Sequence, residues 1–123
     1  MRHILIIDDA STVRLYHRNI LEAAGYNVDE AINGVEGLEK ALANHYDLFL
    51  VDINMPKMDG YGFLQSLRKE NIAQSPAIMV STESADSDHQ QAYLSGANLY
   101  MVKPIKPLKM MTYVRLLVGE DDE

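Results

Sequence analysis

Polar side chains that could handle a phosphoryl group follow four short apolar runs in this sequence. Asp8 and Asp9 come directly after residues 4–7, and Asp52 comes directly after residues 48–51. Three carboxylates packed together repel one another, and each resists ionising unless a cation lies among them. Because carboxylate oxygens are hard ligands and no His or Cys belongs to this group, the cation that it favours is Mg²⁺.

A hydroxyl pair and one ammonium complete the group. Ser81 and Thr82 follow the apolar run at residues 76–80, and Lys103 follows the run at residues 99–102. A lysine cannot bind a metal ion, but its ammonium can hold a phosphoryl oxygen. A bound Mg²⁺, a lysine and a spare carboxylate nucleophile are the parts that aspartyl-phosphate chemistry needs. Each residue alone would be an ordinary loop residue, so the prediction depends on finding all of them together.

The elements that must position these side chains can be predicted from the hydrophobic pattern. Strands are predicted at residues 4–7, 26–30, 48–51, 76–80 and 99–102, each separated from the next by a segment with helical spacing. This alternation predicts an α/β fold in which a doubly wound parallel sheet is covered by helices on both faces. Because crossovers are right-handed, the carboxyl ends of all strands lie along one edge, where such sheets bind ligands.

Capping residues and apolar spacing predict the helices. The first helix has Ser11 as its N-cap and stops at Gly25. The second opens at Asn33, and the third is capped by Asp59. The fourth and fifth helices are predicted at residues 85–94 and 106–118. His89, in the fourth, has no acid or hydroxyl partner at an informative spacing and is interpreted as an ordinary surface or boundary residue. The residues predicted to face inward on the first two helices are Val13, Tyr16, His17, Ile20, Leu21, Ala24, Val35, Leu38 and Leu42.

Length and composition indicate one globular domain. The chain has 123 residues, of which 47% are hydrophobic and 24% charged, and its net charge of −7 disfavours binding to nucleic acid or anionic membranes. The absence of cysteine suits a reducing compartment, and the apolar run at residues 4–7 is too short for a signal peptide or a membrane span. We therefore expect a cytoplasmic domain over residues 1–118 and a short acidic tail at residues 119–123.

Four motifs of the chain resemble, in order, those of the receiver domains of bacterial two-component response regulators. The segment ILIIDDASTVR is similar to the first strand with its acidic pair, LFLVDINMPKMDG to the phosphoacceptor strand and its loop, PAIMVSTESA to the switch strand, and GANLYMVKPI to the fifth strand. The resemblance covers essentially the whole chain and is closest to single-domain chemotaxis receivers of the CheY type. It implies a flavodoxin-like (βα)5 fold with strand order 2-1-3-4-5.

The resemblance also assigns roles to individual residues. Asp52 would accept a phosphoryl group from a sensor histidine kinase or its phosphotransfer domain. Mg²⁺ would be held by Asp9, by Asp52 and by the backbone carbonyl of Asn54, and Asp8 would help through a water molecule. Lys103 would contact the phosphoryl group.

A conformational switch is a further implication of the resemblance. Ser81 would move to bond the phosphoryl group, and Tyr100 matches the aromatic residue whose inward or outward rotamer reports the state. The proline after Lys103 would follow a cis peptide bond. Asn54 and Glu83 match positions that tune dephosphorylation, and this pair implies quick decay of the signal, whereas without the resemblance both would be ordinary polar loop residues.

The expected output is binding to another protein, because no second domain follows within this sequence. Apolar residues in the segment 106–118 cover more than the stripe that core packing needs. Met110, Tyr113 and Leu117 are predicted to lie on an outer face and, with Tyr100, to bind a downstream target. The other interpretation is a wide core stripe with a few exposed residues. This helix is less charged than in chemotaxis receivers, so a flagellar-motor target does not carry over.

Other functions fit part of the pattern. The chain could be a phosphate-shuttle receiver without a motor target, an interaction module independent of phosphorylation, or a receiver taken from a longer DNA-binding regulator. The intact set of site residues argues against the independent module. A Mg²⁺-dependent phosphatase or phosphotransferase would need an acid two residues after its nucleophile, and Asn54 occupies that position. We therefore expect no enzymatic turnover of external substrates.

Overall fold

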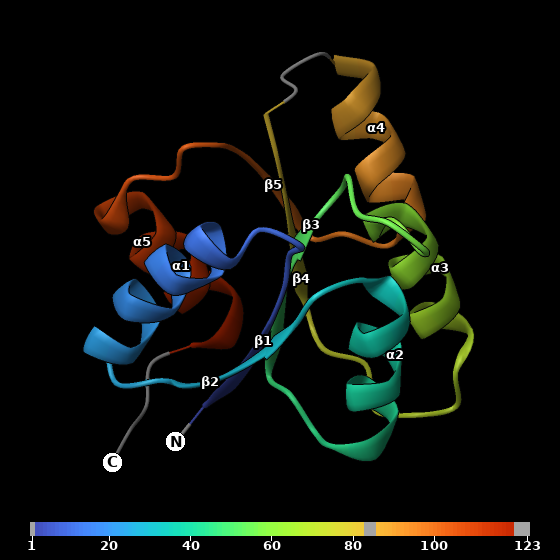
Figure 1. Ribbon diagram of the computed structural model, residues 1–123, viewed down its shortest axis with the longest axis horizontal. Coiled ribbons are helices and arrows are strands. Elements are labelled where there is room, and N and C mark those ends of the chain that lie inside the picture. Colours follow the sequence, from blue (N-terminus) through green and yellow to red (C-terminus); the bar gives the residue numbers. More distant parts are fainter. Residues whose placement is uncertain (1, 83–85, 120–123) are drawn as a thin grey trace.

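The computed structural model describes residues 2–82 and 86–119, which form a five-stranded parallel sheet and five helices (Figure 1). The strand order across the sheet is β2-β1-β3-β4-β5. The strands are β1 (His3–Ile7), β2 (Asn27–Ala31), β3 (Leu48–Asp52), β4 (Ala77–Ser81) and β5 (Leu99–Val102). The helices are α1 (Ser11–Ala23), α2 (Gly34–Ala43), α3 (Gly60–Lys69), α4 (Asp86–Ser95) and α5 (Pro107–Val118).

The predicted fold class and strand order are confirmed, and the strand boundaries differ by a single residue where they differ. One of these differences affects the site. β4 continues to Ser81, which is paired in register with Val102 of β5, so Ser81 ends the strand instead of beginning the loop. The predicted acidic tail lies outside the described residues, except for Gly119.

Two apolar layers hold the helices to the sheet, because successive strand residues point to opposite faces. Figure 1 shows α1 and α5 on one side of the sheet and α2, α3 and α4 on the other. Ile4 and Ile6 of β1 belong to the layer under α1 and α5, whereas Leu5 and Ile7 belong to the opposite layer. Within residues 2–82 and 86–119, the structure contains no helix with both the length and the apolar character that crossing a membrane requires.

The N-termini of three helices show which capping predictions hold. Asn33 accepts a hydrogen bond from the backbone N–H of Glu36 at α2, and Asp59 caps α3 by accepting from Gly62, as predicted. The Ser11 cap is wrong, since Ala10 is the residue that precedes α1 and no side chain caps that helix. The Asp8 carboxylate instead accepts from the N–H of Ala10, so an acid of the candidate site organises the turn into α1.

Helix α2 packs on the sheet through small residues, which corrects part of the predicted inward set. Val35 is 41% exposed and Leu42 is 47% exposed, so neither faces the core. The buried residues of α2 are Gly34, Gly37 and Ala41. A Cβ at Gly37 would meet the side chain of Ile7 at 2.6 Å, so the helix lies closer to β1 than a larger residue would allow. Tyr16 of α1 is likewise 43% exposed, against the prediction.

Gly60, the first residue of α3, lies directly against the strand end that carries Asp52. Its N–H donates to the carbonyl of Ile53 at 2.8 Å. A Cβ built at Gly60 would stand 2.4 Å from the backbone oxygen of Asp52, and this contact cannot be relieved by turning a side chain. The absence of a side chain at Gly60 therefore allows the start of α3 to pack under the strand end.

We predict that Gly60→Ala lowers the free energy of unfolding by about 2–3 kcal/mol, because backbone atoms of β3 must move. Gly62→Ala is the matched control in the same helix. A Cβ at Gly62 would meet only side-chain atoms, at 3.2 Å or more, and we expect a change of less than about 1 kcal/mol there. Urea denaturation of both variants measures the difference, and equal stability of the two would contradict this account of Gly60.

His17 is the buried titratable residue of α1, and its inward position was predicted correctly. Its side chain is 2% exposed. Burial is the largest influence on its pKa, which falls from 6.5 to about 4; the Asp8 carboxylate opposes this change and the Lys103 ammonium adds to it. The folded protein therefore holds His17 neutral at a pH at which the unfolded chain would bind a proton.

This lowered pKa predicts a loss of stability in mild acid. The unfolded state binds more protons than the folded state between pH 6.5 and about 4, so the stabilisation is complete above that window and falls as pH decreases through it. The loss due to His17 amounts to about 3 kcal/mol at the lower end. Denaturation curves across this window should show wild type losing more stability than His17→Gln, and parallel losses would contradict the prediction.

Candidate functional site

Three carboxylates meet at the carboxyl edge of the sheet, as the sequence predicted. Asp8 and Asp9 follow β1, and Asp52 is the last residue of β3. One carboxylate oxygen from each lies within 4.8 Å of the other two, and Asp8 and Asp52 are buried while Asp9 is exposed. The cluster thus opens to solvent on the side of Asp9.

The Lys103 ammonium bridges the two buried acids. Its Nζ lies 3.0 Å from Oδ2 of Asp8 and 3.1 Å from Oδ1 of Asp52. The backbone N–H of Lys103 donates to the carbonyl of Ser81 at 2.7 Å, which fixes the end of β5 beside the end of β4. The peptide bond between Lys103 and Pro104 is cis, as the resemblance implied.

One lysine does not fully balance the charge of the two buried acids. Burial raises the pKa of the Asp52 carboxyl, the Asp8 charge raises it further, and Lys103 only partly opposes these effects. Burial alone would lower the pKa of Lys103, but the hydrogen bond with Asp8 and the charge of Asp52 outweigh it and raise that pKa. The cluster therefore still has an excess of negative charge, which a bound cation would relieve.

The donor set fits a hard divalent cation. The three acidic side chains of the cluster offer carboxylate oxygens, two of them on buried residues and one on an exposed residue. Mg²⁺ prefers such oxygens and keeps several of its waters, for which the exposed side of the cluster leaves access. Asp8, Asp9 and Asp52 are therefore the side chains that would hold it.

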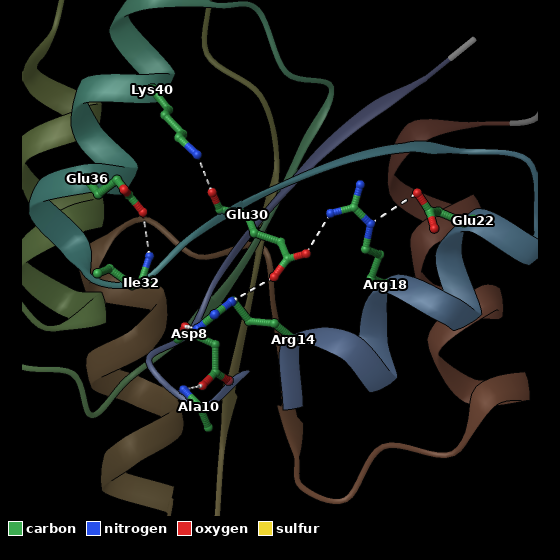
Figure 2. A network of polar contacts seen from close by, with 9 residues as sticks. All are labelled: Asp8, Ala10, Arg14, Arg18, Glu22, Glu30, Ile32, Glu36 and Lys40. Atoms are coloured by element: carbon green, nitrogen blue, oxygen red, sulfur yellow. Dashed lines mark hydrogen bonds and ion pairs between the residues drawn. The ribbon is translucent and has the colours of Figure 1, made fainter. Parts of the chain in front are cut away.

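Behind the cluster, a network of ion pairs fixes Asp8 and the start of α1 (Figure 2). Arg14 donates to the backbone carbonyl of Asp8 at 2.7 Å and, through Nε, to Glu30 of β2 at 2.7 Å. Arg18 contacts the second oxygen of Glu30 at 2.6 Å and also Glu22 at 3.1 Å. Burial alone would raise the pKa of Glu30, but the two arginines outweigh it and lower that pKa. Glu30 is therefore held ionised between α1 and β2.

The other predicted site residues are distributed around this cluster. Ser81 is buried at the end of β4, Thr82 after it is exposed, and Asn54 lies exposed in the loop that follows β3. Tyr100 is buried in β5 with 8% of its surface exposed. Glu83, predicted to tune dephosphorylation, lies outside the described residues.

The predicted partner face on α5 needs correction. Met110 is fully buried, and with Val114 and Val118 it forms the stripe that packs on the sheet. Tyr113 and Leu117 are only partly buried and pack against the same apolar layer. The phase of the helix therefore turns Met110 inward, and the spacing of apolar residues alone could not fix that phase because most of the helix is apolar.

Two residues that matter for the site were missed or misjudged from the sequence. Arg14 joins Asp8 to Glu30, but no spacing rule links residues that are brought together only by the packing of α1 beside β2. His89 was interpreted as an ordinary surface or boundary residue. Its ring in fact stacks on Tyr100 with the centroids 4.0 Å apart. A stack between a helix and a strand leaves no signal in the sequence.

Comparison with known proteins agrees with this arrangement. Residues 4–115 match the family model described as the response regulator receiver domain. The solved structure of the chemotaxis protein CheY4 of Vibrio cholerae superposes with a TM-score of 0.90 at 30% identity, covering 95% of this chain and 98% of that one. The likeness therefore extends over nearly the whole of both chains.

Curated relatives contain the same domain within longer proteins. The transcriptional regulatory protein ResD of Bacillus subtilis is 34% identical over 115 residues, which make up 94% of this chain and 47% of ResD. The sensor protein EvgS of Escherichia coli is 43% identical over 103 residues, which make up 83% of this chain and 8% of EvgS. The chain spans about half the length of the first and under a tenth of the second. By its fold, its carboxylate edge and its family match, the chain belongs to the response regulator receiver domains of two-component systems.

Proposed function

We propose that this receiver is phosphorylated on Asp52 in a Mg²⁺-dependent reaction and signals by binding another protein. The observation that carries the proposal is the position of the Lys103 ammonium, within 3.1 Å of both Asp52 and Asp8, whose carboxylates form a cluster with that of Asp9. A nucleophilic carboxylate, a fixed ammonium and a cation site at one strand edge are what phosphoryl transfer to aspartate needs. The proposal includes a cytoplasmic location and no turnover of external substrates.

The chemical step can be written for a phosphohistidine donor on a sensor kinase or its phosphotransfer domain. A carboxylate oxygen of Asp52 forms a bond to phosphorus while the bond between phosphorus and the donor's imidazole nitrogen breaks. That nitrogen keeps the bonding electron pair and takes up a proton from solvent. Lys103 stands where negative charge develops on the phosphoryl oxygens and stabilises it. Mg²⁺, when bound, supplies the remaining neutralising charge.

The proposed metal ligands are Asp9, Asp52 and the backbone carbonyl of Asn54, and Asp8 takes part through water. Asp8 suits an indirect role, because one of its oxygens already accepts from Ala10 and the other contacts Lys103. Asp9 suits a direct role, because it is the exposed member of the cluster. Asn54 and Glu83 are proposed to tune the lifetime of the phosphoryl group.

A hollow of about 320 Å³ lies beside Lys103, the residue whose ammonium contacts Asp52. It lies between α1 and the loop after β5 and is lined mainly by apolar side-chain surface. The residues around it are Thr12, Val13, Tyr16, His17, Thr82, Lys103, Pro104 and Ile105. We propose that the kinase or phosphotransfer domain docks over this hollow, which would place its histidine next to the strand edge.

In the proposed switch, Ser81 and Tyr100 transmit the presence of the phosphoryl group from the end of β4 to β5. Ser81 ends β4, and its carbonyl accepts from Lys103, so a movement of Ser81 toward the phosphoryl group displaces the end of β5. A charge-assisted hydrogen bond from its hydroxyl contributes about 1.5–3 kcal/mol, which is enough to bias two conformations. Tyr100, two residues before the end of β5, carries the change outward.

The proposed target face combines β5 with the exposed residues of the helices beside it. On α5, Leu108 is 76% exposed and Leu116 is 70% exposed. Tyr113 and Leu117 are partly buried, so only part of each side chain is available to a partner. Exposed aliphatic side chains suit a protein partner more than a nucleic acid, since the chain is strongly acidic. The proposal includes a chemotaxis-like phosphorelay as the system to which the receiver belongs.

We predict that Mg²⁺ stabilises the folded protein through this cluster. At about 100 times its dissociation constant, an ion that binds only the folded state adds about 2.7 kcal/mol. Asp9→Asn should remove most of this gain, and Glu70→Gln, which changes an exposed acid directly after α3, should keep it. Thermal unfolding with and without Mg²⁺ measures the effect, and an equal gain in Asp9→Asn would place the ion elsewhere.

Phosphorylation itself is tested with beryllofluoride, a phosphoryl mimic that binds an aspartate in the presence of Mg²⁺. In amide NMR spectra of wild type, we expect signals near Asp52, Ser81, Tyr100 and Lys103 to shift together. Asp52→Asn should show none of these shifts. Ser81→Ala should keep those near Asp52 and lose those at Tyr100. A wild type that binds Mg²⁺ and ignores the mimic would rule the proposal out.

A further inference from the structure

Helix α4 differs from an ordinary amphipathic helix in how its apolar residues are distributed. Its apolar residues are not gathered on one side, since Tyr93 is 47% exposed and Leu94 is 88% exposed. The side chains of Ala92 and Ser95 are buried, and His89 one turn earlier is half-buried. Both buried residues are small, so His89 is the one large side chain among residues 87–95 that α4 directs inward with a ring contact to the sheet.

The contact between His89 and Tyr100 is close and nearly face to face. The two ring centroids lie 4.0 Å apart and the ring planes are inclined by 29°. Tyr100 is buried in the apolar layer that also contains Val51, Met79 and Ala92. The imidazole therefore covers the Tyr100 ring from the helix side, and Tyr100 cannot turn outward without losing this stack.

Apart from the ring stack, the His89 imidazole makes few favourable interactions. Its Nε2 is buried, and among the described residues it has no hydrogen-bond partner. A buried polar atom without a partner is unfavourable, so the stack must be kept by the ring contact and by the packing of α4. Such an arrangement can be displaced by a modest change of free energy, as a switching element requires.

From these observations we propose that His89 is a positioning residue of the phosphorylation switch. Its ring holds Tyr100 in the buried orientation and so sets the balance between the buried and exposed orientations of that residue. The inference deepens the proposed function, on which its regulatory meaning rests. Stacked aromatic pairs have stabilities that correspond to about a two- to tenfold change in such a balance.

The experiment measures the exposure of Tyr100 directly. The protein is labelled with fluorotyrosine, the Tyr100 signal is assigned with Tyr100→Phe, and its broadening by a soluble nitroxide is compared between variants by fluorine NMR. His89→Ala should raise the exposed fraction of Tyr100 about two- to tenfold. His89→Phe, which keeps a stacking ring without the imidazole nitrogens, should return it to about the wild-type value.

Gln90→Ala is the matched control, since Gln90 is the exposed neighbour on the same helix. It should leave the Tyr100 signal unchanged. Thermal unfolding of each variant separates positioning from mere stability: if His89→Ala lowers the unfolding temperature but leaves Tyr100 as buried as in wild type, the inference is overturned. It is also overturned if His89→Phe behaves like His89→Ala.

A titration with Mg²⁺ and beryllofluoride connects this result to the switch and keeps the two proposals distinguishable. If the orientation of Tyr100 is coupled to Asp52, His89→Ala must change the affinity for the mimic by a comparable factor, because coupling is reciprocal. Unchanged affinity with a changed Tyr100 exposure would overturn the regulatory role of His89. If wild-type amides near Asp52 ignore the mimic, the proposed function fails, whereas the nitroxide result still decides whether His89 holds Tyr100.

Discussion

The contact of Lys103 with Asp8 and Asp52 is the interaction on which this structure depends. Parallel strands must end along one edge, and in this chain two of those ends bring buried carboxylates together. Without a cation, their mutual repulsion would oppose the packing of β1 beside β3. Lys103 supplies one positive charge from the end of β5, and the remaining negative charge is what makes the edge suitable for a metal ion.

The rest of the fold positions that contact. Arg14 and Glu30 fix the backbone of Asp8 from β2 and α1, and the hydrogen bond from Lys103 to Ser81 fixes β5 beside β4. Gly60 lets α3 begin directly under the end of β3. These supports come from different elements, so the geometry of the edge reflects the assembly of the whole sheet and not any single loop.

The sequence was sufficient for the fold and for the composition of the site, because both follow from local patterns. Buried strands that end in acids, hydroxyls and a lysine determine where those groups must meet. Asp59 caps the helix that it was predicted to cap, and the second helix opens at Asn33 as predicted. The sequence was insufficient where tertiary contacts decide. Apolar residues surround most of α5, so only packing shows that Met110 faces inward, and the ring stack of His89 has no local pattern at all.

The inward face of α4 has a consequence for how such a domain can diversify. Over residues 87–95, the side chains packed inward are a stacked imidazole and the small Ala92 and Ser95, and the outward Tyr93 and Leu94 contribute little to the core. Substitutions on the outward face therefore cost the fold little stability while they change what a partner meets. Natural variation can in this way exchange one recognition surface for another and leave the residues at the strand edge unchanged. Related receivers can then bind different partner proteins while they keep the same fold.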